Sequence, residues 1–162
     1  MKLSEDLTKR GLIKDKTFDD VAWLDKPRKF YLGIDAASAD SLTIGNLAVI
    51  LLARRFIEAD WKAVMLAGGA TSLVGDPGGK DEERALADKS TVAANIKVVK
   101  TQIEKVLAGA PHEVVNNADW LDNLKYLDFL RDTGKHYPVS DLLQRDFVAT
   151  RLAEHGSGIS YA

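Results

Sequence analysis

The sequence has no cysteine among its 162 residues and only four prolines. The absence of cysteine excludes disulfide bonds and thiolate metal sites, and it is typical of proteins that work in a reducing compartment. No apolar run approaches the roughly 18 residues that a membrane helix needs, and the first residues lack the apolar core of a signal peptide. We therefore expect a cytoplasmic protein with no membrane association.

Positive and negative charges are also nearly balanced, because the sequence has 22 Lys and Arg residues and 24 Asp and Glu residues. A net charge of -2 creates no overall attraction to nucleic acid. The three histidines, His112, His136 and His155, lack the spacing of a metal site, so no metal-binding residue is predicted. No catalytic nucleophile or carboxylate pair is evident from spacing. The apolar content of 46% predicts one globular domain with a core.

The stretch from Phe30 to Phe56 is the most informative part of the chain. Phe30–Ile34 alternates large apolar residues and leads into small, polar residues, which predicts a strand followed by a loop. Leu42–Phe56 is apolar and free of proline, which predicts a helix that is mostly buried on all sides. A strand, a loop and a helix in this order are typical of nucleotide-binding sheets, where phosphates contact the free N–H groups of the helix.

Gly45 stands in the first turn of this expected helix, where glycine costs about 1 kcal/mol relative to alanine. One interpretation is that a flat ring or a backbone lies against the helix at this point. The alternative is a glycine kept only for helix packing.

A second unusual stretch, Gly68–Lys80, contains five glycines and predicts a ligand loop or hinge without regular structure. It does not fit a phosphate-binding loop, because Val74 stands where the first glycine of that motif is needed. It follows an expected strand, and open α/β sheets bind ligands at the carboxyl ends of their strands.

The remaining segments complete an α/β pattern with a parallel sheet. They predict strands at Trp61–Ala67 and His112–Val115, short helices at 3–12 and 19–24, a helix capped by Ser90 and ending before Gly109, a polar turn at Asn116–Trp120, a helix at Leu121–Leu130 with Leu124, Leu127 and Leu130 inward, and an amphipathic segment at Asp141–Leu152.

Eight motifs in order resemble the N-terminal part of bacterial tyrosyl-tRNA synthetases, a family of class I aminoacyl-tRNA synthetases. They are Arg10–Ile13, Tyr31–Asp35, Ala39–Leu47, Arg54–Phe56, Gly68–Pro77 with Glu83 and Arg84, Asn116–Trp120, Phe129–His136 and Gly158–Tyr161. The resemblance implies a Rossmann-like parallel sheet with flanking helices and a helical connective insertion, incomplete at the C-terminus because the later motifs of the family are absent. It also implies activation of tyrosine with ATP and Mg²⁺ to tyrosyl-adenylate, and transfer of the tyrosyl group to tRNA(Tyr).

The resemblance further implies the site residues. Those implied for tyrosine are Tyr31, Thr71, Asp76 and Asn117; those for ATP are Gly33, Asp35, Ser38, Gly45 and Asn46; and those for catalysis are Thr43, Asn46, Lys80 and Arg84. The His-Ile-Gly-His signature of the family appears as Thr43-Ile44-Gly45-Asn46, so threonine replaces the first histidine. In the family this histidine stabilises the ATP phosphates, and loss of one such donor typically costs about 2.7–4 kcal/mol.

The whole chain, residues 1–162, would then be the N-terminal part of the catalytic domain, with a helical N-terminal segment at 1–27. Residues from about 121 to 162 would begin the connective region that forms a homodimer in the family. The apolar residues Leu127, Phe129, Leu130, Val139, Leu142 and Leu143 would suit the dimer patch, and the alternative is that they form an internal helix face. We expect the 162 residues alone to be an inactive fragment. The alternatives are a non-catalytic paralogue or nucleotide-binding module of the same fold, and another adenylyl-transferring enzyme of the superfamily.

Overall fold

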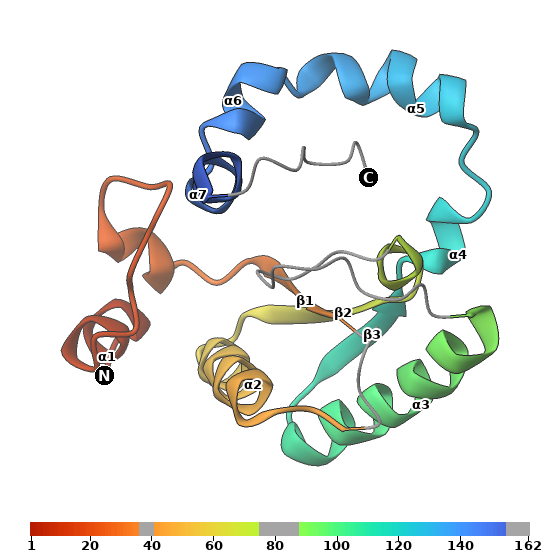
Figure 1. The fold of residues 1–162 in the computed structure, drawn as a ribbon. Helices are drawn as coiled ribbons and strands as arrows, with labels where there is room; N and C mark the ends of the chain where they lie inside the picture. Colours follow the sequence, from red (N-terminus) through yellow and green to blue (C-terminus); the bar gives the residue numbers. More distant parts are fainter. Residues whose placement is uncertain (36–40, 75–87, 155–162) are drawn as a thin grey trace.

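A computed structural model describes residues 1–35, 41–74 and 88–154 of the chain (Figure 1). Its centre is a sheet of three parallel strands in the order β1 (Lys29–Asp35), β2 (Lys62–Gly68) and β3 (His112–Asn116). Asp35 pairs with Gly68, and Asn116 pairs with the neighbouring Ala67. The three predicted strands are therefore confirmed, and their carboxyl ends meet at one edge of the sheet.

Helices α2 (Ile44–Glu58) and α3 (Lys89–Val106) cover one face of this sheet (Figure 1). The core between these layers contains Ile34 and Met65 from the sheet, Ile50 from α2, and Val99 and Ile103 from α3. The helix that the sequence predicts before Gly109 is thus confirmed, and one of its faces lies in this core. Gly109, with a φ of +79°, follows this helix in the left-handed conformation that glycine adopts without strain.

The prediction that α2 is buried on all sides is wrong. Ile50, Ala53 and Ile57, at the three- and four-residue spacing of one helix face, are buried, whereas Ile44 is 86% exposed and Leu51 is 45% exposed. Within the described ranges, the contacts of α2 with other elements are chiefly with β2 and α3. An apolar composition indicates that the helix surface should be buried, but it does not show which segment of the chain buries it.

The N-cap of α3 is Asp88, not the predicted Ser90. The Asp88 carboxylate accepts hydrogen bonds from Ser90 Oγ at 2.5 Å and from the Thr91 N–H at 2.9 Å. Bonds from Ser90 and Thr91 hold the pKa of this carboxyl well below its usual value of 3.8. Ser90 supports the cap instead of forming it, because a carboxylate accepts both bonds at once.

We expect Asp88→Ala to lower the Tm by about 2–4 °C at neutral pH, since α3 loses its cap. A carboxyl group whose pKa is lower in the folded protein than in the unfolded chain stabilises the fold at pH values above the unfolded pKa. This contribution is lost as the pH falls toward the folded pKa. Thermal unfolding followed by circular dichroism should therefore show a gap between wild type and variant that narrows below about pH 4. A gap that does not change with pH would contradict the charged cap.

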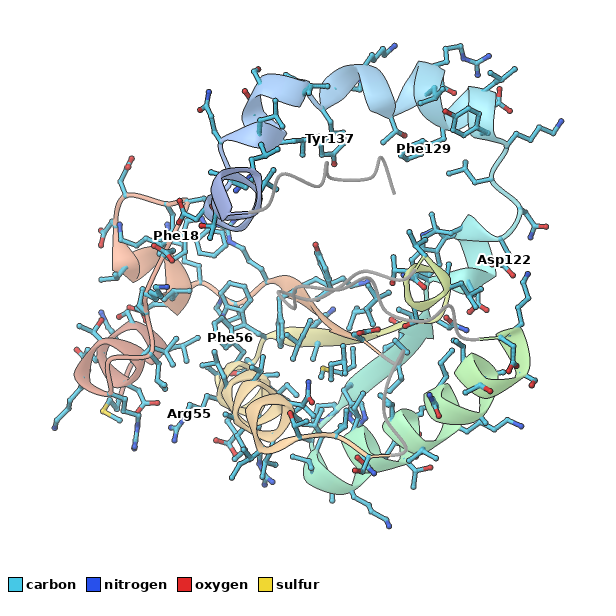
Figure 2. All side chains as sticks on the ribbon, viewed as in Figure 1. Phe18, Arg55, Phe56, Asp122, Phe129 and Tyr137 are labelled. Atoms are coloured by element: carbon cyan, nitrogen blue, oxygen red, sulfur yellow. The ribbon has the colours of Figure 1, made fainter. Side chains whose placement is uncertain are left out.

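The N-terminal segment packs on the end of α2 through helix α1 (Leu3–Lys9) and the 3₁₀ helix η1 (Val21–Asp25). Leu3, Leu7, Leu24 and Trp61 form a second buried cluster. Arg55 Nη1 lies 2.8 Å from Asp6 Oδ2, and hydrogen bonds from Arg10 and Arg55 lower the pKa of that carboxyl. Figure 2 shows Arg55 and Phe56 on α2, the helix on which this segment packs. The two short helices expected in this region are confirmed.

The C-terminal helices form an arc over the other face of the sheet (Figure 1). They are α4 (Ala118–Leu121), α5 (Tyr126–Asp132), the 3₁₀ helix η3 (Gly134–His136), α6 (Val139–Leu143) and α7 (Asp146–Glu154). The single helix predicted at Leu121–Leu130 is wrong, because Asp122 and Asn123, which favour turns, separate α4 from α5. Leu124 and Leu127 are 46% and 75% exposed instead of inward.

Two further details of this region differ from the prediction. The expected turn at Asn116–Trp120 is the end of β3 followed by α4, and the expected segment at Asp141–Leu152 is divided between α6 and α7. The assignment of this region to a connective insertion stays a prediction. None of the helices in the described ranges is both long and apolar enough to cross a lipid bilayer.

Candidate functional site

A pocket of about 190 Å³ lies at the carboxyl ends of the strands. It is lined by Gly33, Ile34, Asp35, Leu66, Gly68, Thr71 and Asn117. Four of these residues, Gly33, Asp35, Thr71 and Asn117, were singled out in the sequence, and they come from three separate segments of the chain. The fold therefore brings part of the predicted tyrosine and ATP sites to one place.

A short 3₁₀ helix, η2 (Thr71–Leu73), follows β2 where the sequence predicts no regular structure. Asn117, which is only 4% exposed, fixes its start. The Ala70 N–H donates to Asn117 Oδ1 at 2.8 Å, and Asn117 Nδ2 donates to Thr71 Oγ1 at 3.1 Å. The Asn117 amide thus positions the segment that carries Thr71.

Gly68 allows this close packing. A Cβ atom at this position would lie 2.8 Å from Thr71 Oγ1 and 3.4 Å from the Ile34 carbonyl oxygen. The first distance is too short for a carbon and an oxygen atom, whereas the second is an ordinary contact, so a larger residue would displace the Thr71 side chain.

Ser72 is a residue of this site that sequence reasoning missed. Its side chain is 4% exposed, and its Oγ donates a hydrogen bond of 2.6 Å to Asp35 Oδ1. The two residues are 37 positions apart and belong to different elements. No local pattern in the sequence indicates that they meet.

The start of α2 holds three other predicted residues, Thr43, Gly45 and Asn46. Thr43 is the N-cap, and its Oγ1 and backbone N lie 2.8 and 3.0 Å from Asn46 Oδ1. The side-chain Oδ1 of Asn46 thus accepts from Thr43, which leaves the side-chain NH₂ group of Asn46 as a hydrogen-bond donor. Among the described residues, a Cβ atom at Gly45 would meet only Thr43 Oγ1, at 3.6 Å, so no core side chain of these residues fills the space beside this glycine.

Tyr31 lies on β1 with 75% of its surface exposed. Because side chains alternate along a strand, Tyr31, Gly33 and Asp35 share the sheet face that is turned away from the core. Tyr31 is two residues before the pocket lining. The other predicted site residues, Ser38, Asp76, Lys80 and Arg84, lie outside the described residues.

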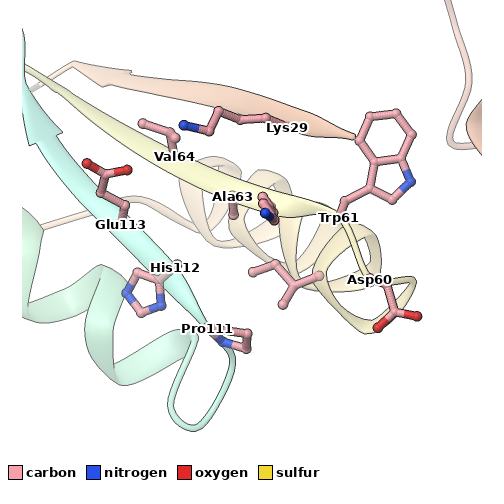
Figure 3. Close-up of a pocket in the computed structure, with 10 residues that line it drawn as sticks. Lys29, Asp60, Trp61, Ala63, Val64, Pro111, His112 and Glu113 are labelled. Carbon is pink, nitrogen blue, oxygen red and sulfur yellow. The ribbon is translucent and has the colours of Figure 1, made fainter. Parts of the chain in front are cut away.

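Larger cavities are present elsewhere. One of about 450 Å³ lies at the amino ends of the strands, between Lys29, Trp61 and His112 (Figure 3). Another, of about 410 Å³, lies between α2 and α3. We favour the smaller pocket because ligands of open α/β sheets bind beyond the carboxyl ends of the strands. No three His, Asp or Glu side chains in the described part of the chain are grouped so that they could hold a metal ion.

The chain is similar to known proteins over nearly its whole length. The family described as "tRNA synthetases class I (W and Y)" matches residues 24–162. The chain is 39% identical to tyrosine–tRNA ligase 1 of Vibrio vulnificus over 164 residues and 43% identical to tyrosine–tRNA ligase of Aeromonas hydrophila over 166 residues. Each match covers 98% of this chain and 39% of the relative, so the chain spans about two fifths of their length.

A solved structure shows the same fold. The crystal structure of a C-terminally truncated mitochondrial tyrosyl-tRNA synthetase from Aspergillus nidulans matches with a TM-score of 0.77 and 28% sequence identity. The match covers 99% of this chain and 49% of that one.

Proposed function

Because the chain belongs to the class I tRNA synthetases of the W and Y group, we propose that the whole protein is a cytoplasmic tyrosine–tRNA ligase that acts in protein biosynthesis. The observation that carries this proposal is the pocket at the carboxyl ends of the strands, where Gly33, Asp35, Thr71 and Asn117 converge. The relatives with 39% and 43% identity are tyrosine–tRNA ligases, which favours tyrosine over tryptophan as the amino acid.

The proposed chemistry requires positioning instead of a protein nucleophile. A carboxylate oxygen of tyrosine attacks the α-phosphorus of ATP, the bond to the leaving oxygen breaks, and pyrophosphate departs with its electron pair. The tyrosyl group then passes from the adenylate to a ribose hydroxyl of tRNA(Tyr), and AMP leaves. Such in-line reactions are accelerated by orientation and by donors aimed at the developing charge.

Seven of the predicted residues have a specific role in this proposal. Asn46 donates to ATP, Gly45 lies against the adenine, and Lys80 and Arg84 hold the leaving pyrophosphate. Asp76 accepts from the tyrosine ammonium, and Tyr31 and Thr71 line the amino-acid pocket. Mg²⁺ would enter as the ion bound to the phosphates of ATP, where it neutralises part of their charge.

A tyrosine-dependent exchange of pyrophosphate into ATP, catalysed by the complete gene product, tests the proposal. We expect exchange with tyrosine and none without an amino acid. Exchange that depends on tryptophan and not on tyrosine would support the proposed type of reaction but overturn tyrosine as the amino acid. Binding of ATP without any exchange would favour the alternative of a non-catalytic nucleotide-binding module.

The apolar side chains of the C-terminal arc support a further part of the proposal, a homodimer. Leu127 is 75% exposed and Val139 is 67% exposed; Phe129 and Tyr137 lie along the same arc (Figure 2). Exposed apolar patches of this kind mark interaction surfaces. We expect light scattering to give the mass of a dimer for the complete protein. The double variant Leu127→Asp, Val139→Asp should give the mass of a monomer. A wild-type monomer would contradict this assignment.

A further inference from the structure

We infer that Ser72 is a positioning residue that holds the Asp35 carboxylate in its working orientation; this inference rests on the proposed function. Serine in an exposed glycine-rich loop would ordinarily face water. Ser72 is instead 4% exposed, and its hydroxyl donates to Asp35 Oδ1 at 2.6 Å. Hydrogen bonds to a carboxylate at this distance are among the strong ones.

Ser72 can act as a fixed point because η2 is itself anchored to Asn117, the residue directly after β3. The Asn117 side chain accepts a hydrogen bond from the Ala70 N–H and donates one to the Thr71 hydroxyl. Ala70 and Thr71 are the two residues directly before Ser72. The backbone of η2 follows β2 after two residues, so this short helix is held both by β2 and by Asn117, and Ser72 contacts Asp35 at the end of β1. Asp35 is thereby oriented by a segment that follows β2 and is held by Asn117.

This orientation matters because Asp35 is an exposed residue at the end of a strand and lines the pocket. An aspartate in such a place has two side-chain torsions that a ligand would otherwise have to fix at a cost in binding. A carboxylate only accepts hydrogen bonds, so its ligand partners are donors such as ribose hydroxyls, and the phosphates of ATP must lie elsewhere. Ser72 therefore contributes to ATP affinity through Asp35.

The experiment compares Ser72→Ala with a matched control in the complete gene product. We expect Ser72→Ala to raise the KM for ATP in tyrosine-dependent pyrophosphate exchange by about tenfold and to leave kcat within about twofold. The control is Ser4→Ala, because Ser4 is also buried, at 6% exposure, and its Oγ donates to Asp25 Oδ2 at 2.8 Å, in the N-terminal segment. Ser4→Ala should leave the KM for ATP unchanged.

A double-variant cycle separates positioning from a general loss of stability. If Ser72 acts through Asp35, Ser72→Ala should add nothing to the KM for ATP in an Asp35→Ala background. An unchanged KM in Ser72→Ala, an equal rise in Ser4→Ala, or full additivity with Asp35→Ala would each overturn the inference.

A structural measurement decides the inference even where the activity is not the one proposed. Wild-type protein without tyrosine-dependent exchange would defeat the proposed function alone. Crystal structures of wild type and Ser72→Ala then still test the positioning role, since the Asp35 side chain should leave its wild-type rotamer in the variant. An Asp35 carboxylate that stays in place without the Ser72 hydroxyl would overturn it.

Discussion

Gly45→Ala is expected to make the protein more stable and nearly inactive. In the part of the chain that the structure describes, a Cβ atom at position 45 would contact only Thr43 Oγ1, at 3.6 Å, which is an ordinary van der Waals distance. Since alanine loses less backbone entropy than glycine in a helix, the variant should gain about 0.5–1 kcal/mol. The same methyl group would stand where we propose that the adenine lies, and a displacement of about 1 Å at a reacting centre can cost about 100-fold.

Two measurements on the complete gene product check this pair of opposite effects. Thermal unfolding should show a higher Tm, and kcat/KM for ATP in pyrophosphate exchange should fall about 100-fold. Gly134→Ala is the control, because a Cβ atom there would also make only ordinary contacts, the nearest with Leu130 Cδ2 at 3.5 Å. A Gly45→Ala protein that is fully active would show that ATP does not lie against this helix.

The sheet was predictable from sequence because each strand contains a short apolar stretch with polar residues or turn residues beside it. Phe30–Ile34, Trp61–Ala67 and His112–Val115 each fall within one or two residues of an observed strand. Parallel pairing followed from the intervening helices, and parallel pairing brings the carboxyl ends together. The location of the candidate site was therefore predictable before any side-chain contact was known.

The errors come from features that local pattern does not determine. Leu124 and Leu127 have helical spacing, but spacing does not show whether a helix has a partner, and both side chains are exposed. Asp88 and Ser90 are both good N-caps two residues apart, and the choice between them depends on backbone conformation. The contact between Ser72 and Asp35 arises only when the fold brings β1 and η2 together.

Gly69→Ala is expected to have the largest effect on stability. Gly69 is buried directly after β2, and a Cβ atom there would lie 2.2 Å from Asn116 Oδ1 and 2.9 Å from Ile96 Cδ1. The Ile96 methyl group is the end of a flexible side chain and can move. The Asn116 amide is held in place, because its Oδ1 accepts a hydrogen bond of 3.1 Å from the Ala118 N–H at the start of α4.

The alanine methyl group must therefore displace the Asn116 side chain, which breaks its bond to Ala118 and disturbs Asn117, the residue that fixes η2. Overpacking together with a lost hydrogen bond should cost about 2–3 kcal/mol, or a fall in Tm of about 5–10 °C. Thermal unfolding of Gly69→Ala, of Asn116→Ala and of the double variant measures this directly. Because Asn116→Ala removes the obstructing amide, the double variant should be more stable than the sum of the single changes predicts. Strict additivity, or a Gly69→Ala protein as stable as wild type, would show that close packing of Gly69 against the Asn116 side chain does not limit the residue at position 69.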